Sequence, residues 1–224
     1  MNKLNHVAFI MDGNGRWGKK RNKGRNFGHI NGVKTVKKIV ETSVKLKIPI
    51  VTFYVFSTEN WKRPRAEINF LFKLIINYFR EELSNVVSNG IKINIIGKRK
   101  NLPTKIRSAL KKVSNLTREN TKIIVNLAIN YGSKAEIINA FKKLNKKKNI
   151  SIKSLEKNFY TANLPDPDIL IRTGGRKRLS NFMLWQLAYS EIYFLDKLWP
   201  DFNSKDFKKI VNNFKKIKRN FGSI

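Results

Sequence analysis

The chain has 224 residues, with 47 Lys and Arg against 15 Asp and Glu, a formal net charge of +32 and no cysteine. This length suits one α/β domain that buries roughly 70% of the surface its unfolded chain exposes. The lack of cysteine excludes disulfides, zinc–thiolate sites and thiol nucleophiles, so any metal must be held by oxygen or by the two histidines. The longest strongly apolar stretch, residues 48–56, is too short to span a membrane, and we expect a cytoplasmic protein.

The charge first raises nucleic acid as a partner. However, the lysine-dense segments 142–148 and 205–218 alternate lysines with helix-spaced apolar residues, which is typical of solvated helix faces. We therefore expect no nucleic acid partner. Anionic phospholipid attracts lysine by about 1 kcal/mol per residue near the surface, which favours a peripheral contact at the inner face of the membrane.

The order of predicted elements indicates the fold class. An apolar run at 7–11 predicts a buried strand, and three- and four-residue spacing predicts a helix over 30–44 that ends before Pro49. Further along we expect strands at 50–56, 91–96, 123–129 and 168–171, and helices at 67–87, 103–116, 135–144, 152–159 and 207–217, with a polar loop at 57–65. This alternation predicts a single domain, 1–224, with a mostly parallel central sheet flanked by helices on both faces.

A Gly-rich segment, Asp12-Gly13-Asn14-Gly15-Arg16-Trp17, follows the first strand. Gly13 and Gly15 allow positive φ angles and expose backbone amides to phosphate, and Arg16 adds a planar cation. Asp12 would repel a phosphate unless a divalent cation bridges the two anions. The segment therefore predicts a metal-assisted diphosphate site.

The same residues, from Gly13 to Gly18, spell GxGxxG, so two alternatives stay open. A dinucleotide site needs a helix directly after the motif and an acidic residue about 20 positions on. Residues 19–25 have no apolar period, and the next acidic residue is Glu41. The second alternative is a Gly-rich turn with a purely structural role.

Polar residues also follow three other predicted strands, at 57–61, 130–132 and 172–175. Ligands bind beyond the carboxyl ends of such strands, so we expect these segments to converge on one cleft with Asp12. Arg172, Arg178 and Ser180 surround a Gly-Gly turn and suit a second diphosphate, the alternative being an incidental surface turn. Glu191 is a lone carboxylate in an apolar run and requires a metal or an arginine.

Taken together, these segments resemble the cis-prenyltransferase family, and within it the bacterial undecaprenyl diphosphate synthases. The matching motifs cover essentially the whole chain: residues 6–17, Gly28-His29 with Gly32, residues 56–64, Asn130-Tyr131-Gly132, residues 171–175, and residues 180–182 through Glu191 to Trp199-Pro200. The main rival class, the trans-prenyltransferases, uses DDxxD motifs on an all-helical fold, and the chain has no such motif.

The resemblance implies a homodimeric, Mg²⁺-dependent enzyme that adds isopentenyl diphosphate to an allylic primer, typically farnesyl diphosphate. It implies that Asp12 and Glu191 handle the metal and that residues 13–16, with Trp17, Arg25 and His29, hold the primer diphosphate. Arg172, Arg178 and Ser180 would hold isopentenyl diphosphate. A mobile loop would carry Ser57, Asn60, Trp61, Arg63 and Glu67, with Asn60 and Ser57 helping to remove a proton. A catalytically silent partner subunit is disfavoured by retention of these residues.

Product growth needs an apolar channel, for which the helix at 67–87 offers Leu71, Leu74, Ile75, Ile76, Phe79 and Leu83. Three residues depart from the family pattern. Arg176 stands where a glutamate is usual, Ser133 replaces a common second glycine, and Gly18 stands where alanine is frequent. The resemblance implies a long-chain polyprenyl diphosphate, undecaprenyl diphosphate, as the product, and shorter-chain cis-prenyl products are the alternative outcome of the same chemistry.

Overall fold

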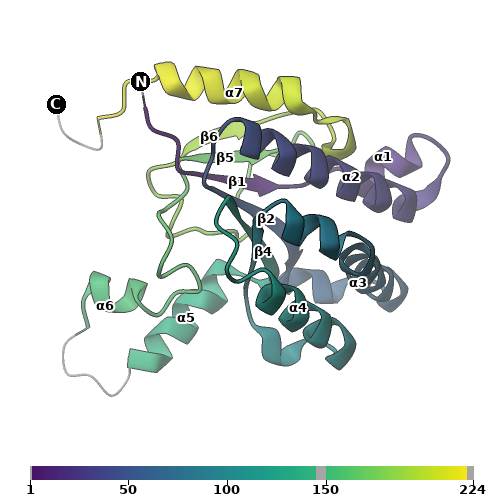
Figure 1. The fold of residues 1–224 in the computed structure, drawn as a ribbon, viewed down its shortest axis with the longest axis horizontal. Coiled ribbons are helices and arrows are strands. Elements are labelled where there is room, and N and C mark those ends of the chain that lie inside the picture. Colours follow the sequence, from purple (N-terminus) through teal and green to yellow (C-terminus); the bar gives the residue numbers. More distant parts are fainter. Residues whose placement is uncertain (1, 145–149, 221–224) are drawn as a thin grey trace.

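The computed structural model describes residues 2–144 and 150–220 (Figure 1). The predicted lysine run at 142–148 therefore lies partly outside the described residues. Six parallel strands form one sheet in the order β3-β4-β2-β1-β5-β6. They are β1 (His6–Ile10), β2 (Ile50–Ser57), β3 (Ile91–Ile96), β4 (Ile123–Tyr131), β5 (Ile169–Arg172) and β6 (Glu191–Phe194). The predicted parallel sheet is confirmed.

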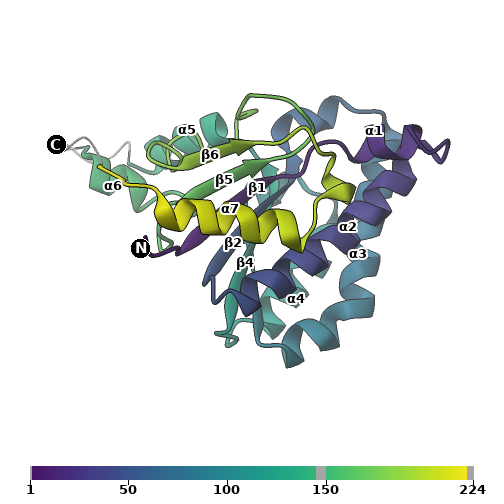
Figure 2. The same cartoon turned by 90° about the horizontal axis from the view of Figure 1, so that it is seen from above.

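Helices cover both faces of this sheet. They are α1 (Asn14–Lys19), α2 (Gly24–Lys45), α3 (Arg65–Ser88), α4 (Thr104–Leu116), α5 (Ser133–Leu144), α6 (Ile152–Glu156) and α7 (Ser204–Lys216). The larger apolar core packs α2, α3, α4 and α7 against one face, and Figure 2 shows these helices on the same side of the sheet. A smaller core on the other face includes Phe182, Met183 and Leu187. No helix among the described residues has both the length and the hydropathy needed to cross a membrane.

A polar ladder crosses the buried sheet. Thr52 Oγ1 accepts a hydrogen bond from Asn126 Nδ2 at 2.9 Å and lies 2.7 Å from His6 Nε2, while Asn94 Nδ2 donates to Asn126 Oδ1 at 2.9 Å. His6 Nδ1 lies 2.8 Å from the Pro165 carbonyl, which requires a proton on Nδ1 and leaves Nε2 as an acceptor. Burial lowers the pKa of His6 to about 4. His6 is therefore neutral at neutral pH, and the ladder that begins at its ring joins β1, β2, β4 and β3 by side-chain hydrogen bonds.

Four elements differ from the sequence prediction. The segment after Gly13 is helical (α1), and α2 begins at Gly24 rather than near residue 30. A helix does therefore follow Gly13 directly, contrary to the expectation that counted against a dinucleotide site. The 58–62 part of the expected loop is a 3-10 helix. Strand β6 was not predicted, because its residues are only partly buried at the sheet edge and show no clean alternation.

The topology explains where a ligand can bind. From β1 the chain crosses to β2 on one side, while β5 pairs with β1 on the other. The order of strands thus reverses at β1, and such switch points leave a crevice beyond the strands' carboxyl ends. Asp12 follows β1 there, and Arg172 ends β5.

Candidate active site

Asp12 lies in this crevice between two arginines. Arg172 Nη2 donates to Asp12 Oδ2 at 3.0 Å, and Arg16 Nη2 donates to Oδ1 at 3.1 Å. The Arg172 side chain is 4% exposed, whereas those of Arg16 and Asp12 are 43% and 30% exposed. Arg16 also donates to the Gly174 carbonyl at 2.7 Å. The cluster offers solvent-accessible cation and carboxylate side by side.

The Gly13–Gly15 segment is built differently from the predicted loop. Gly13 has φ +110°, as expected, and a Cβ there would meet Leu198 Cδ2 at 2.8 Å. Gly15 is helical rather than left-handed, so its predicted positive φ was wrong. A Cβ at Gly15 would meet Arg25 Cζ at 2.7 Å, so this glycine instead allows a guanidinium to approach α1.

Trp17 and Asn14 point into protein rather than into open crevice. The Trp17 indole donates to Asp201 Oδ1 at 2.6 Å and stacks on Phe27 with ring centroids 5.6 Å apart. Asn14 Nδ2 donates to the Met11 carbonyl at 3.3 Å, and its Oδ1 is buried without a hydrogen-bond partner among the described residues. Trp17 thereby fixes α1 on α2, and Asn14 lines a cavity described below.

Arg172 is held from its other side by the turn that follows the Gly-Gly pair. Its Nη1 donates to Ser180 Oγ at 2.7 Å and to the Arg178 carbonyl. Ser180 adopts φ +51°, which a non-glycine residue rarely does without local support. The Arg178 side chain itself is exposed, as are Arg176 and Lys177, so the turn presents three further cations to solvent.

A second charged cluster joins the start of α3 to α2. Glu67 accepts two hydrogen bonds from Arg25, from Nε at 3.1 Å and from Nη2 at 3.0 Å, and one from Arg63 Nη1 at 3.1 Å. Burial acts to raise the pKa of Glu67, but the hydrogen bonds and charge of Arg25 and the charge of Arg63 outweigh it and lower that pKa. Glu67 therefore stays ionised and holds both arginines at the crevice.

His29 lies against the same carboxylate, with Nε2 3.6 Å from Glu67 Oε1. Burial and the charge of Arg63 lower its pKa to about 4, despite the opposing effect of Glu67. Nε2 is buried, and at 3.6 Å it is too far for a hydrogen bond. His29 is thus neutral at neutral pH and offers a hydrogen bond, not a charge.

The predicted loop residues form a compact unit. Asn60 Oδ1 accepts a hydrogen bond from the Ser57 backbone amide at 3.1 Å, and the Trp61 indole donates to Asn130 Oδ1 at 2.7 Å. Trp61 also packs edge-on against Phe56, with centroids 5.2 Å apart. Ser57 and Asn60 therefore lie together, as expected, while Arg63 and Glu67 belong to the neighbouring charged cluster.

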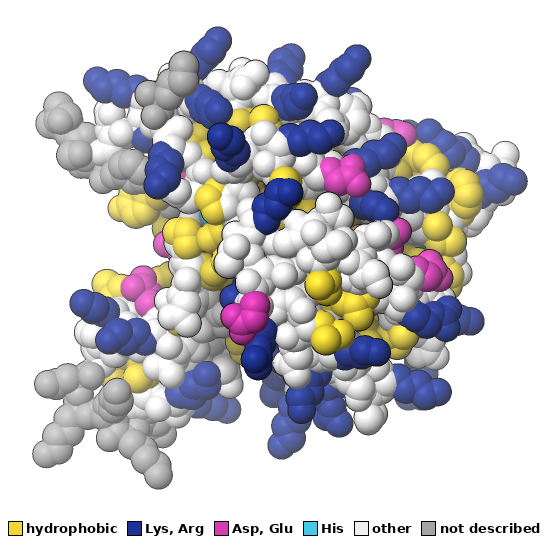
Figure 3. Space-filling view, in the orientation of Figure 1, with side chains coloured by type: hydrophobic (Ala, Val, Ile, Leu, Met, Phe, Trp, Pro, Cys, Tyr) yellow, Lys and Arg dark blue, Asp and Glu magenta, His cyan; other side chains and the backbone are white. Residues whose placement is uncertain are grey.

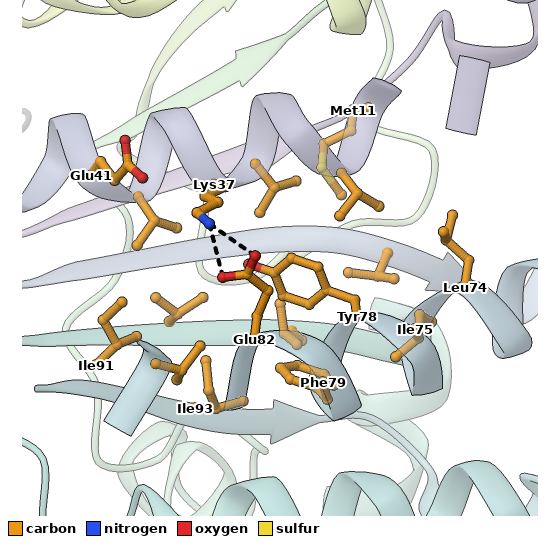
Figure 4. A pocket seen from close by; sticks show the side chains of 18 of the residues that line it. Met11, Lys37, Glu41, Leu74, Ile75, Tyr78, Phe79, Glu82, Ile91 and Ile93 are labelled. Carbon is orange, nitrogen blue, oxygen red and sulfur yellow. Dashed lines mark hydrogen bonds and ion pairs between the residues drawn. The ribbon is translucent and has the colours of Figure 1, made fainter. Parts of the chain in front are cut away.

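An apolar cavity of about 530 Å³ lies between α2, α3 and the sheet (Figure 4). Asn14 and His29 line it, so it begins next to the charged groups. Four of the six predicted channel residues line it, namely Leu71, Leu74, Ile75 and Phe79. The other two, Ile76 and Leu83, pack against the hydrophobic core instead.

Glu191 does not join Asp12 within this chain. It begins β6 and is paired in register with Ile169, whereas Arg172, which reaches Asp12, is paired with Phe194. Three residues along parallel strands separate the two positions by about 10 Å. Glu191 is instead 3.6 Å from Arg219 Nε. Because β6 places Glu191 at the amino end of the sheet, one chain alone does not bring together the two carboxylates, Asp12 and Glu191, that the resemblance assigns to the metal.

The residues at Asp12 fit a magnesium ion held together with a diphosphate. Mg²⁺ usually takes one or two carboxylates plus substrate phosphates and water. The Asp12 carboxylate uses one hydrogen bond per oxygen and remains partly exposed, so it keeps free acceptor positions. Among the described residues no three His, Asp or Glu side chains gather into an all-protein cage. This arrangement suits a metal that substrate oxygens complete.

Several supporting residues lie in segments that the sequence predicts at the cleft, but their contact partners were not predicted. Asn130 lies at a register irregularity opposite Phe56 and Ser57, has φ +51°, and bonds both Trp61 and the Lys98 carbonyl. Thr173 Oγ1 donates to the Asp12 carbonyl at 2.8 Å. The Asn130-Tyr131-Gly132 motif indicated Asn130, but its partner Trp61 is 69 residues away and could not be predicted from local pattern.

Asn181 and Ser133 tie the Arg178–Ser180 turn to its neighbours. Asn181 Nδ2 donates to Glu59 Oε1 at 2.8 Å, and Ser133 Oγ accepts from the Leu184 amide at 3.0 Å. A glycine at 133 could not make the second bond. The glycine at position 18 is explained by close packing, because a Cβ there would lie 2.0 Å from the Gly24 carbonyl oxygen.

The fold and site together define a parallel α/β protein with a cluster of arginines and carboxylates next to an apolar cavity. The model of the family described as "Putative undecaprenyl diphosphate synthase" matches residues 10–222. An isoprenyl transferase from Fusobacterium nucleatum is 44% identical, covering 98% of this chain and 96% of its own length. One from Clostridium tetani is 43% identical, covering 98% and 89%.

Solved structures agree. A "probable undecaprenyl diphosphate synthase" from Campylobacter jejuni is 38% identical with a TM-score of 0.85 and covers 100% of both chains. Lavandulyl diphosphate synthase from Lavandula x intermedia, in complex with dimethylallyl diphosphate, is 31% identical with a TM-score of 0.94 and covers 98% of both. This chain belongs to the cis-prenyltransferase family of undecaprenyl diphosphate synthases. It is a prenyltransferase, and the dinucleotide and all-helical trans-prenyltransferase alternatives are set aside.

Proposed function

We propose that this prenyltransferase depends on Mg²⁺ and condenses isopentenyl diphosphate onto farnesyl diphosphate to make a long polyprenyl diphosphate, with undecaprenyl diphosphate as the product. One observation carries the proposal. Arg16 and Arg172 converge on the Asp12 carboxylate at 3.1 and 3.0 Å, and Met11, the residue before Asp12, lines an apolar cavity of about 530 Å³. The arginines would bind the charged diphosphate, and the cavity would bind the hydrocarbon tail.

The chemistry needs positive charge where the leaving group forms. The allylic C–O bond breaks and its electron pair leaves with diphosphate, a new C–C bond forms to isopentenyl diphosphate, and a proton is then lost to give the cis alkene. In the proposal Arg16, Arg25 and Gly13 to Gly15 hold the primer diphosphate, with His29 as a neutral hydrogen-bonding group. Cations preorganised at the leaving oxygens stabilise charge that develops in the transition state.

Arg172, Arg178 and Ser180 would hold isopentenyl diphosphate beside it. The Arg172–Ser180 bond at 2.7 Å supports this by fixing the guanidinium next to Asp12. Asp12 would hold Mg²⁺, which neutralises diphosphate charge when bound. Ser57 and Asn60 would assist proton removal, and Trp61, which is 37% exposed, would exclude water from the reacting carbon.

The test is incubation with both diphosphates in Mg²⁺ or in EDTA, followed by chromatography of the dephosphorylated product. We expect extended products only with Mg²⁺ and none from Asp12→Ala. Glu119→Ala, which removes an exposed carboxylate 85% accessible to solvent, is the matched control and should keep full activity. Normal turnover by a folded Asp12→Ala protein would overturn the role of Asp12.

A homodimer belongs to the same proposal, because Glu191 can assist the metal at Asp12 only from a second copy. The partly exposed edge strand β6, with Ile192 40% exposed, supports an interface there. Subunit mixing tests this. Asp12→Ala and Glu191→Ala proteins, each inactive alone, should regain activity when mixed, since one site per hybrid then holds both carboxylates. If Glu191 acts within its own chain, mixing restores nothing.

Peripheral contact with anionic membrane lipid completes the proposal. Lysine and arginine side chains spread over the face in Figure 3, and few acidic groups interrupt them. Such a surface attracts anionic headgroups without a single binding groove. We expect co-sedimentation with vesicles containing phosphatidylglycerol and none with phosphatidylcholine vesicles. Equal binding to both would refute a charge-based contact.

A further inference from the structure

The turn that carries Ser180 has an unusual backbone. Ser180, Asn181 and Met183 have φ angles of +51°, +62° and +44°, and they are three of the six non-glycine residues with positive φ among those described. Asparagine adopts this conformation more readily than most residues, whereas serine and methionine do so only where neighbouring contacts enforce it. Because Ser180 Oγ accepts a hydrogen bond from Arg172 Nη1 at 2.7 Å, the contacts that hold this turn also hold the Arg172 guanidinium.

Asn181 connects this turn to the start of α5. Its backbone carbonyl accepts a hydrogen bond from the Ser133 amide at 2.8 Å, and its side-chain Oδ1 accepts one from the Lys134 amide at 2.9 Å. The first amides of a helix have no acceptor within the helix, so Asn181 supplies acceptors that α5 itself lacks. These two bonds give Asn181 a structural role at α5.

The nitrogen of the same side chain contacts the segment to which we assign proton removal. Asn181 Nδ2 donates to Glu59 Oε1 at 2.8 Å. Glu59 belongs to the 3-10 helix Thr58–Lys62 and directly precedes Asn60. Burial acts to raise the pKa of Glu59, but the hydrogen bonds that it accepts, first among them the one from Asn181, outweigh burial and lower that pKa. The acceptor is therefore a carboxylate at neutral pH, which strengthens the bond.

A glycine makes room for this contact. A Cβ at Gly132 would lie 2.7 Å from Asn181 Nδ2 and would also clash with the Thr58 hydroxyl. Gly132 lies between β4 and α5, so the Asn181 amide passes close to the backbone there on its way to the 3-10 helix. One side chain thus contacts α5 through its oxygen and the Asn60 segment through its nitrogen.

The 3-10 helix has contacts on two sides. Within it, the Ser57 amide donates to Asn60 Oδ1 at 3.1 Å, and the Arg63 amide donates to the Asn60 carbonyl at 3.0 Å. The Trp61 indole fastens the helix to β4, whereas the Glu59–Asn181 bond fastens it to the turn that carries Ser180. The position of Asn60 relative to this turn therefore depends on the Glu59–Asn181 bond.

We propose that Asn181 is a positioning residue, and that its bond to Glu59 holds Asn60 next to the isopentenyl diphosphate site. The bond is a feature of the fold, whereas its consequence for catalysis rests on the proposed function of Asn60 and Ser180. Asn181 acts through Glu59 and contacts no reacting atom. Bond formation and proton removal need the two segments at a fixed separation, so loss of the bond lowers kcat even when both substrates are bound.

Glu59→Ala tests the bond without touching the turn, because Asn181 keeps both of its bonds to α5. We expect kcat to fall about tenfold, the effect of losing one hydrogen bond to a charged group. The KM for farnesyl diphosphate should stay unchanged, since the primer groups lie outside this link. Glu119→Ala, which removes an exposed carboxylate far from the link in sequence, is the matched control and should keep the wild-type kcat.

A rescue experiment separates positioning from the role at α5. Asn181→Asp keeps an oxygen for the Lys134 amide and tolerates a left-handed backbone, but it places a second carboxylate against Glu59. Its kcat should fall at least as far as that of Glu59→Ala. Asn181→Asp/Glu59→Gln exchanges donor and acceptor and should regain most of the lost kcat. Full kcat in Glu59→Ala, or a double variant no faster than Asn181→Asp, overturns the inference.

Hydrogen exchange of the protein without substrates tests the physical basis. Peptides covering residues 57–63 should exchange about tenfold faster in Glu59→Ala and Asn181→Asp, and at the wild-type rate in Asn181→Asp/Glu59→Gln and Glu119→Ala. Unchanged exchange in Glu59→Ala overturns the inference and leaves the proposed function intact. Absence of products from the wild-type protein overturns the proposed function, while exchange still decides whether the bond orders the Asn60 segment.

Discussion

Replacing Asp12 should unbalance a buried cation as well as disable a catalytic group. The Arg172 side chain is 4% exposed, and Asp12 is its carboxylate partner among the described residues. In Asp12→Ala the guanidinium keeps its bonds to Ser180 and to the Arg178 carbonyl but loses its counter-charge. Its Nε is already buried without a partner among these residues. The folded state must then hold an uncompensated positive charge.

The magnitude follows from the two exposures. Removing one partner of a fully buried pair costs about 3–5 kcal/mol. The Asp12 side chain is 30% exposed, so water already screens part of the attraction, and two neutral hydrogen bonds to Arg172 remain. We therefore expect Asp12→Ala to lower the free energy of unfolding by about 2 kcal/mol. In a chain of this size that corresponds to a decrease in Tm of about 4–8 °C.

Arg16→Ala is the matched comparison, because it breaks the other bond to the same carboxylate. Arg16 is 43% exposed, so this loss should cost less than about 1 kcal/mol. Urea and thermal unfolding followed by circular dichroism would measure both variants. Inorganic diphosphate, which replaces the missing anion, should raise the Tm of Asp12→Ala more than that of the wild type.

An Asp12→Ala protein that is no less stable than Arg16→Ala would contradict a stabilising role for the Asp12–Arg172 pair. That result would mean that Arg172 is neutralised by solvent or by its hydrogen bonds alone. Any loss of turnover in Asp12→Ala should then be attributed to chemistry without a stability component.

Three further changes probe the scaffold. The pKa of His6 is about 4 in the folded protein and 6.5 in the unfolded chain, so between these pH values only the unfolded chain takes up a proton. The free energy of unfolding should therefore fall by about 3 kcal/mol as the pH drops from 6.5 to 4, and His6 should cause no further change above pH 6.5. Comparing urea midpoints of the wild type and His6→Gln over this pH range isolates the contribution of His6. Gly28→Ala places a Cβ 1.8 Å from the Asn14 carbonyl oxygen and should cost about 1–3 kcal/mol by forcing α1 from α2, so an unchanged Tm would refute the contact. Ser133→Gly loses the bond to the Leu184 amide and should cost about 1 kcal/mol, measured by thermal unfolding, whereas a gain in stability would contradict its role.

Much of the fold could be read from local pattern. Strand β1 is buried on both faces and appears in the sequence as a continuous apolar run, and α7 shows apolar residues at helical spacing. Strand β6 could not be read in this way, because its partly exposed residues at the sheet edge lack a clear period. Likewise α1 is six residues long, and its glycines are explained by contacts with α2 rather than by helix propensity.

The sequence by itself determined the family and the chemical types at the site. Asp12, Arg16 and Arg172 are recognisable because a carboxylate and two guanidiniums follow strands, and strand ends of a parallel sheet converge. Tertiary structure alone decided which groups meet. Register along β6 separates Glu191 from Asp12, and burial makes His29 neutral. These outcomes depend on distance and dielectric environment, which are set by packing between residues far apart in the chain.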